Sequence, residues 1–498
     1  MSNFLASFTV EPDTGKPLYQ QIGEYLQQQI LSRAIPAGMR LPPERKLAEA
    51  LDVSRTTAIH TYHWLEQSGL VASRVGSGTY VIDLPENTQT LPGMPWDQLF
   101  RPLGKNPMVS ILRDLMGMPR AEISLAGGMI DPAMYPAEAI QNVLHELSSK
   151  MCDLGYIPTE GYGPLRTSLA RLMETRGAET LPENILVTAG SQQALYLAAR
   201  SFLEPGDYVI LESPTYIGAI QLFQALGARI LALPNTKSFP LDVLEDYLTR
   251  YRPKLFYTIP SFQNPTGRVL STVTRQEILK LGERYRLVIL EDDPYSELYY
   301  AQRPPESLKA LDPYGGVLYL GTLSKVLVPG LRAGWLAGPA AVINRLAQEK
   351  QYVDLHCANL SQHVTHRLLE ENVLSQHLKR IRPIYARRRD ALALALREHA
   401  HPHLTFDSPE GGFYFWCTLK APITAQQLLH EAAKAGISFV PGDAFYANQY
   451  GTDQLRLCFV THNEQDLASA ARHIGEICSK LSHFEASPRI PAVSQPLR

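Results

Sequence analysis

Short, unbroken apolar runs recur along the middle of this 498-residue chain, and they limit its fold more than any other feature. They lie at residues 185–188, 208–211, 255–258, 287–290 and 317–320, and stretches with a helical pattern separate them. Strands that are apolar along their whole length are buried on both faces, as in a parallel sheet covered by helices. The pattern therefore predicts an α/β domain built around a mostly parallel sheet.

Polar motifs follow several of these runs, where each predicted strand ends. In folds of this kind, ligands bind beyond the carboxyl ends of the strands. The first motif, Gly190-Ser191-Gln192, opens a helix, whose free N–H groups and dipole suit a phosphate group. We therefore expect Ser191 and Gln192 to lie in a ligand site at this edge of the sheet.

The motif after the last run contains a lysine, Lys325, preceded by the hydroxyl residues Thr322 and Ser324. A desolvated lysine amine can form a Schiff base with an aldehyde. The two hydroxyls and the guanidinium of Arg332 suit a phosphate. An aldehyde beside a phosphate suggests pyridoxal 5′-phosphate (PLP), with Lys325 as its catalytic lysine. Taken alone, the motif fits a strand end with a surface lysine equally well.

Four further residues at strand ends suit the ring of the same cofactor. A carboxylate at Asp292 can hold the pyridine nitrogen protonated and so preserve its role as an electron sink. Tyr295 and Asn264 can hydrogen-bond the ring hydroxyl, and Tyr216 offers a flat face for stacking. Individually, Asn264 fits a turn, Asp292 a helix cap and Tyr216 the core. Their order after successive strands makes a joint coincidence improbable, and we assign no metal site.

The first eighty residues have a different pattern. Apolar residues at helical spacing predict a helix from about Pro17 to Ser32, and Pro42-Pro43 opens a second one. Ser54 is a good N-cap for a third helix, which follows the second after a tight turn, as in a helix-turn-helix. Two β-like runs around Gly76-Ser77-Gly78 predict a wing. A protein–protein interaction module is the alternative, but the wing and the polar start of the third helix favour DNA binding.

Charge supports DNA binding only locally. The whole chain has a net charge of −2, whereas residues 33–74 carry six Lys/Arg against four acidic residues. Affinity would therefore depend on individually placed arginines and would fall as salt rises.

The module resembles the GntR-type winged helix-turn-helix through residues 17–22, 36–45, 53–57 and 76–81. The resemblance implies DNA contacts from Arg40, Arg45, Ser54, Arg55, Thr57, His60, Arg74 and Gly76.

The larger region, about residues 110–480, is similar to the fold-type I aminotransferases, notably those related to aminoadipate and kynurenine aminotransferases. The matching stretches include 160–166, 190–193, 212–216 and 263–267, together with the segments around Asp292, Lys325 and Arg456. The resemblance implies that Tyr156 reaches the phosphate of a partner subunit. It also implies that Arg456 clamps a carboxylate of the bound effector or substrate.

The predicted organisation has four parts. Residues 1–82 form the winged helix-turn-helix, and the proline-rich segment 83–107 is a linker. Residues 108–484 form the aminotransferase-like domain, with a smaller C-terminal α+β lobe from about residue 345. The Pro- and Ser-rich tail, 485–498, is expected to be disordered. No apolar run approaches the ~20 residues of a membrane span, and five scattered cysteines with no secretory signal indicate a cytoplasmic protein.

A winged helix ahead of an aminotransferase-like domain resembles the MocR subfamily of GntR regulators. The resemblance implies a homodimeric, PLP-dependent transcriptional regulator that binds an operator in double-stranded DNA. It would sense an amine, an amino acid or the cofactor itself. A working aminotransferase with an accessory DNA-binding head is the alternative, because the sequence shows no lost catalytic position.

Overall fold

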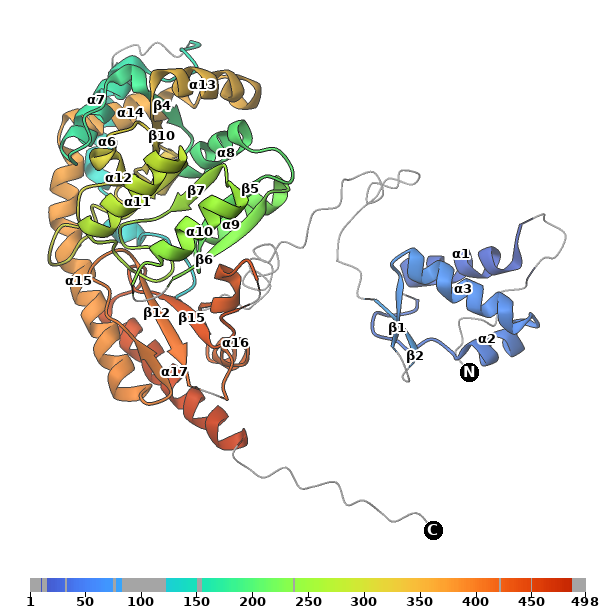
Figure 1. Ribbon diagram of the computed structural model, residues 1–498. Coiled ribbons are helices and arrows are strands. Elements are labelled where there is room, and N and C mark those ends of the chain that lie inside the picture. The colour runs from blue at the N-terminus through green and yellow to red at the C-terminus, as the bar shows by residue number, and fades with distance from the viewer. Residues whose placement is uncertain are drawn as a thin grey trace. The chain divides into compact units, whose positions relative to one another are not determined.

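The computed structural model describes residues 10, 16–31, 34–74, 78–82, 122–149, 155–235, 238–420, 422–448 and 450–485. The chain divides into two compact units, Met1–Pro102 and Leu103–Arg498 (Figure 1). The predicted linker, residues 83–107, and the start of the larger domain up to residue 121 lie outside the described residues. The predicted domain boundaries therefore stay predictions.

The smaller unit is a bundle of three helices with a β-hairpin. Its elements are α1 (Leu18–Leu31), α2 (Glu44–Leu51), α3 (Arg55–Gln67), β1 (Val71–Arg74) and β2 (Gly78–Val81), the two strands being antiparallel. Helices α1 and α3 approach closely at Gly23, where a Cβ atom would lie 2.6 Å from the ring of Trp64. The predicted N-cap is confirmed, because the Ser54 hydroxyl accepts from the Thr57 N–H at 3.1 Å. These elements match the predicted winged helix-turn-helix.

The larger unit contains a seven-stranded sheet with the order β4-β10-β9-β8-β7-β5-β6. The strands are β4 (Ile185–Thr188), β5 (Tyr208–Ser213), β6 (Arg229–Pro234), β7 (Leu255–Thr258), β8 (Val288–Asp293), β9 (Val317–Thr322) and β10 (Gly334–Ala337). Only β10 runs antiparallel to its neighbours, β4 and β9. The predicted, mostly parallel sheet is confirmed, and all five apolar runs form strands in it.

Helices cover both faces of this sheet. Adjacent residues of one strand point to opposite faces, so that Leu255 packs in one apolar cluster and Phe256 in another. The first cluster includes α8 (Ser191–Phe202), α9 (Ile217–Ala225) and α13 (Ala340–Asp354), and the second includes α10 (Leu241–Tyr251), α11 (Thr272–Tyr285) and α12 (Leu308–Leu311). Burial on both faces explains why the strands are apolar throughout.

The smaller lobe has a four-stranded sheet with the order β11-β12-β15-β14. Its elements are β11 (Leu404–Phe406), β12 (Tyr414–Leu419), α16 (Ala425–Lys434), β14 (Val440–Pro441), β15 (Gln454–Cys458) and α17 (Glu464–Glu485). Helices α14 (Asn359–Glu370) and α15 (Val373–His399) precede it, and α6 (Ala137–Ser149) and α7 (Gly163–Glu174) lie earlier in the chain. Both strands predicted for this lobe, around residues 413–419 and 455–460, are present.

Two details differ from the sequence-based expectations. The smaller lobe is not wholly C-terminal, because β3 (Ile123–Ser124) pairs in parallel with β13 (Ile437–Ser438). Strands of two residues carry no periodicity, so this long-range pairing has no local signal. Helix α17 also includes Glu485, where the predicted tail begins, and residues 486–498 lie outside the described part of the chain. No described helix is long and apolar enough to cross a membrane.

Candidate functional site

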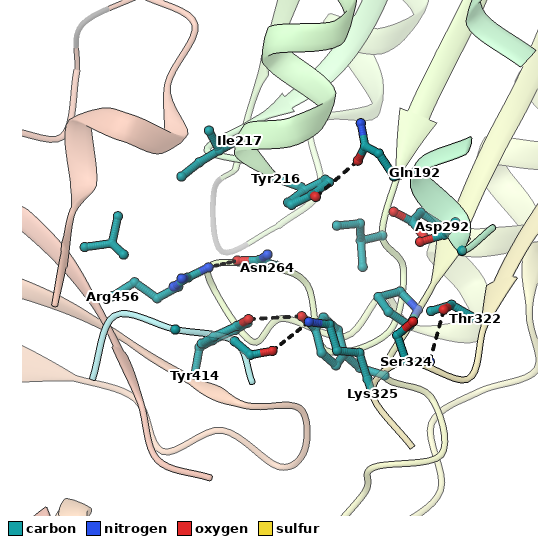
Figure 2. A pocket seen from close by; sticks show the side chains of 18 of the residues that line it. Gln192, Tyr216, Ile217, Asn264, Asp292, Thr322, Ser324, Lys325, Tyr414 and Arg456 are labelled. Carbon is teal, nitrogen blue, oxygen red and sulfur yellow. Dashed lines mark hydrogen bonds between the residues drawn. The ribbon is translucent and has the colours of Figure 1, made fainter. Parts of the chain in front are cut away.

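A cavity of about 340 Å³ lies at the carboxyl edge of the seven-stranded sheet (Figure 2). It brings together eleven of the predicted site residues: Ser191, Gln192, Tyr216, Asn264, Asp292, Tyr295, Thr322, Ser324, Lys325, Arg332 and Arg456. Most come from the ends of strands or the segments after them, whereas Arg456 comes from β15 of the smaller lobe. Helices and strands far apart in the sequence therefore supply one site.

Lys325 extends into this cavity just after β9. Its Nζ donates to the backbone oxygen of Gly128 at 2.6 Å. Burial of the amine lowers the pKa of Lys325 from the usual 10.5 to about 8, and the guanidinium groups of Arg456 and Arg332 act in the same direction. The neutral, nucleophilic form of the amine is therefore a larger fraction near neutral pH than in an ordinary lysine, although most of the amine is still protonated there.

The lowered pKa predicts how fast the cofactor-free protein captures an aldehyde. A lysine reacts only when its amine is neutral, so the rate rises with pH and reaches half its plateau near pH 8. Stopped-flow absorbance after mixing with PLP across pH 6 to 11 measures this profile. A midpoint near 10.5, the value of an ordinary lysine, would contradict the prediction.

Asp292 ends the buried strand β8 and has one carboxylate oxygen without a partner. Its Oδ2 accepts from the Tyr257 hydroxyl at 2.7 Å, and its Oδ1 has no hydrogen-bond partner among the described residues. Burial raises the pKa of Asp292 to about 7, although the hydrogen bond from Tyr257 opposes this shift. A buried, unpartnered carboxylate oxygen fits a protonated ring nitrogen of PLP, which would keep the carboxylate ionised.

The start of α8 forms another part of the cavity wall. Its N-cap, Gly190, has a φ of +89° and provides no side-chain cap, so the first N–H groups of the helix are available to an anion. Arg332 lies against this turn, because its Nη2 donates to the backbone oxygen of Ala189 at 2.9 Å. Its Nη1 lies 3.5 Å from the Ser324 hydroxyl. These groups fit a phosphate.

The Thr322 hydroxyl is hydrogen-bonded to the backbone at both sides, which the sequence did not indicate. Its hydroxyl donates to the backbone oxygen of Ala333 at 3.2 Å and accepts from the Ser324 N–H at 3.1 Å. In this arrangement Thr322 shapes the turn before Lys325, and Ser324 has the freer hydroxyl.

The remaining predicted residues form the walls of the cavity. Tyr216 donates from its hydroxyl to Gln192 Oε1 at 3.2 Å, which fixes the ring across the cavity from Lys325 (Figure 2). Asn264 Oδ1 accepts from Arg456 Nη1 at 2.9 Å, so only its amide nitrogen remains to donate to a ring hydroxyl.

Two functional positions were missed as site residues by sequence reasoning. The Tyr414 hydroxyl accepts from the Tyr295 hydroxyl at 3.2 Å, and its ring lies 4.0 Å from the guanidinium carbon of Arg456. Gly128 supplies the oxygen bound by Lys325, and a Cβ atom there would lie 2.0 Å from the Tyr414 hydroxyl. The double glycine Gly127-Gly128 was the available sequence signal for this close approach.

Tyr156 is the one predicted cofactor-binding residue that does not line the cavity. Its side chain is 88% exposed, and its ring packs edge-on against His356 with 5.7 Å between the ring centroids. Its contact with a partner subunit stays a prediction.

Several predicted DNA contacts lie at the surface of the smaller unit. The side chains of Arg45 and Arg55 are 84% and 70% exposed, and each faces a carboxylate, that of Glu49 or Glu44. Arg40 and His60 are also exposed.

The other predicted contacts include two residues of the cap and two of the wing. Ser54 and Thr57 join in the N-cap of α3 through hydroxyls 2.8 Å apart. The Arg74 side chain and Gly76 lie outside the described residues.

Comparisons with known proteins agree with both units. The family model for aminotransferase class I and II matches residues 131–474, and that for bacterial regulatory proteins of the gntR family matches residues 18–81. The chain is 38% identical to a 2-aminoadipate transaminase of Thermus thermophilus, over 77% of this chain and 97% of the relative. It is 32% identical to the uncharacterized HTH-type transcriptional regulator YisV of Bacillus subtilis, over 93% of this chain and 96% of the relative.

Solved structures resemble the larger unit. Pyrococcus horikoshii kynurenine aminotransferase, solved in complex with PMP, gives a TM-score of 0.72 at 35% identity and covers 78% of this chain and 98% of its own. LysN, an α-aminoadipate aminotransferase from Thermus thermophilus, gives a TM-score of 0.72 at 36% identity. This match covers 78% of the present chain and 100% of the LysN chain. It was solved with N-(5′-phosphopyridoxyl)-L-leucine.

Together the fold, the cavity and these similarities define a PLP-dependent, aminotransferase-like domain joined to a DNA-binding winged helix-turn-helix. The chain belongs to the MocR subfamily of GntR-type transcriptional regulators. The sequence-based predictions of the family, the fold class and the cofactor are therefore confirmed.

Proposed function

We propose that this regulator senses an amine or amino acid in the Lys325 cavity and changes its affinity for operator DNA in response. When bound, PLP supplies an aldehyde that exchanges amines and a ring that withdraws electrons. The observation that carries the proposal is the joint presence, in one chain, of the cavity around Lys325 and the gntR module. A ligand can act this way only if it binds two conformational states of the protein unequally.

Different residues of the cavity wall would hold different parts of the cofactor. The first N–H groups of α8, with Ser324 and Arg332, would bind its phosphate. Asp292 would bind its ring nitrogen, Tyr295 and Asn264 its ring hydroxyl, and Tyr216 one face of its ring. Lys325, whose pKa is lowered to about 8, would supply the reactive amine.

Arg456 supports an effector that carries a carboxylate. The residue is 7% exposed, and its guanidinium lies between the rings of Tyr414 and Phe445, 4.0 and 4.8 Å from their centroids. Asn264 and the backbone oxygen of Ala126 accept from its two terminal nitrogens, and Nε has no hydrogen-bond partner among the described residues. A buried cation with an open donor suits a carboxylate, as in an amino acid.

The surface around Tyr156 supports a homodimer. Five large apolar side chains are 49–88% exposed there or on the nearby α13–α14 segment: Tyr156, Tyr352, Val353, Leu355 and Leu360. The segments are adjacent, because Asn359 Nδ2 donates to the backbone oxygen of Gly155 at 3.3 Å. Exposed apolar groups of this size favour burial against another protein surface, and the proposed occupant is a second copy of the chain.

Because the proposed regulator binds an operator in DNA, it would act in the cytoplasm.

A second candidate function is transamination. Lys325 would have to act as a general base after its displacement, and a lysine whose pKa is about 8 suits that task. The 38% identity to a transaminase over most of the larger unit also favours it. Turnover of a keto acid at ordinary enzyme rates would support this alternative over a purely sensory site.

The test is a screen of amines and amino acids for changes in the absorbance of the bound cofactor, with the wild-type and the Lys325→Ala protein. We expect one chemical class to shift the wild-type spectrum, and to shift that of the variant more slowly, because the amine must then condense with a free aldehyde instead of exchanging with Lys325. If no ligand shifts the wild-type spectrum, sensing through Lys325 is wrong.

A further inference from the structure

A series of hydrogen bonds from residues outside the cavity holds the start of α8. Gln193 Oε1 accepts from the backbone N–H of Ala189 at 2.7 Å, and Gln193 Nε2 donates to Asp354 Oδ2 at 2.8 Å. Lys350 Nζ then donates to Asp354 Oδ1 at 2.7 Å. Gln193, Asp354 and Lys350 do not line the cavity, so they act on the turn from outside it.

Both polar backbone groups of Ala189 are hydrogen-bonded by side chains. Gln193 binds its N–H group, and Arg332 Nη2 donates to its oxygen at 2.9 Å. Gly190 follows directly, and a Cβ atom at this position would lie 2.7 Å from Arg332 Nη2. Because Gly190 caps α8, the orientation of the first N–H groups of the helix depends on these hydrogen bonds.

The hydrogen bonds among these three side chains fix which way the Gln193 amide points. A carboxylate only accepts hydrogen bonds, so the Gln193 amide must turn its NH₂ group to Asp354 and its oxygen to Ala189. Lys350 is fully buried, and Asp354 is the one carboxylate found within ion-pair distance of it in the described part of the chain. The ion pair with the buried Lys350 therefore holds the Asp354 side chain in the position from which it accepts from Gln193.

We propose that Gln193, Asp354 and Lys350 form a positioning relay that raises the affinity of the protein for the phosphate group of its cofactor. The relay aligns the N–H groups at the start of α8, and the phosphate is bound by those groups rather than by the relay itself. This inference rests on the proposed placement of the phosphate at the start of α8.

The test compares two probes, PLP and pyridoxal, which differ only in the phosphate group. Cofactor-free protein is titrated with each, and dissociation constants are measured by protein fluorescence. Gln193→Leu keeps a similar volume and removes both hydrogen bonds, so we expect its affinity for PLP to fall roughly tenfold. Its affinity for pyridoxal should stay at the wild-type value. The matched control is Gln224→Leu, at an exposed position on α9, which should change neither.

Each other outcome is decisive. Unchanged PLP affinity in Gln193→Leu, or an equal loss for both probes, would overturn the relay. If the wild-type protein does not prefer PLP over pyridoxal, the phosphate placement itself fails, and the relay fails with it. If Gln193→Leu does not fold, Gln193→Asn gives the same comparison, because its shorter amide cannot reach both Ala189 and Asp354. The phosphorus NMR shift of bound PLP should move in either variant.

Discussion

Lys325→Ala is expected to abolish all covalent attachment of the cofactor, because Lys325 is the one lysine among the described residues that line the cavity. Borohydride reduction followed by mass spectrometry of the intact chain measures this attachment. The wild-type protein should gain the mass of one reduced cofactor, and the variant should gain none. PLP should still bind to the variant without a covalent bond, since Asp292 and the start of α8 remain.

The control for this result is Lys434→Ala. Lys434 lies on α16, is 59% exposed and pairs with Glu431, so its removal should leave attachment at the wild-type level. A reduced cofactor found on another lysine in the Lys325→Ala protein would contradict the assignment of Lys325.

Arg55→Ala is expected to weaken operator binding by about 1–3 kcal/mol, or roughly 5- to 150-fold. Arg55 opens α3, the second helix of the helix-turn-helix, and its side chain is 70% exposed and 3.4 Å from Glu44. Fluorescence anisotropy with an operator duplex, selected from random sequences by the wild-type protein, measures the loss. A phosphate contact would also lower the slope of affinity against salt by about one, whereas a base contact would leave that slope unchanged.

Arg345→Ala is the matched control for Arg55→Ala. Arg345 lies on α13 of the larger unit, is 62% exposed and also pairs with a glutamate, Glu349. It should bind the operator with wild-type affinity. An equal loss of operator affinity in the two variants would mean that the total positive charge of the protein, rather than the start of α3, determines binding.

The sheet and most of the site were predictable because their signals are local. A strand end and the motif that follows it are adjacent in sequence, as for β8 and Asp292 or β9 and Lys325. Parallel strands then bring such motifs to one edge without any knowledge of side-chain packing. The winged helix was predictable for a related reason, since its Ser54 cap and its turn residues specify neighbouring backbone.

The missed features depend on contacts between distant parts of the chain. The Lys325–Gly128 hydrogen bond joins residues 197 positions apart, and the Ile123–Ile437 strand pair joins the beginning of the larger unit to its end. Tyr414 belongs to a strand whose aromatic residues all fit the core. It lines the cavity only because the smaller lobe packs against the larger one. Sequence periodicity does not show which distant segments pack together.

The affinity of the holoprotein for its selected operator, measured with and without the ligand that shifts the cofactor spectrum, tests the central claim most directly. The account predicts that this ligand changes the dissociation constant of the wild-type protein by roughly 5- to 150-fold, the usual range of allosteric coupling. It predicts no change for the cofactor-free protein, which has no aldehyde to react with the ligand. A ligand that shifts the wild-type spectrum and leaves operator affinity unchanged would contradict the account.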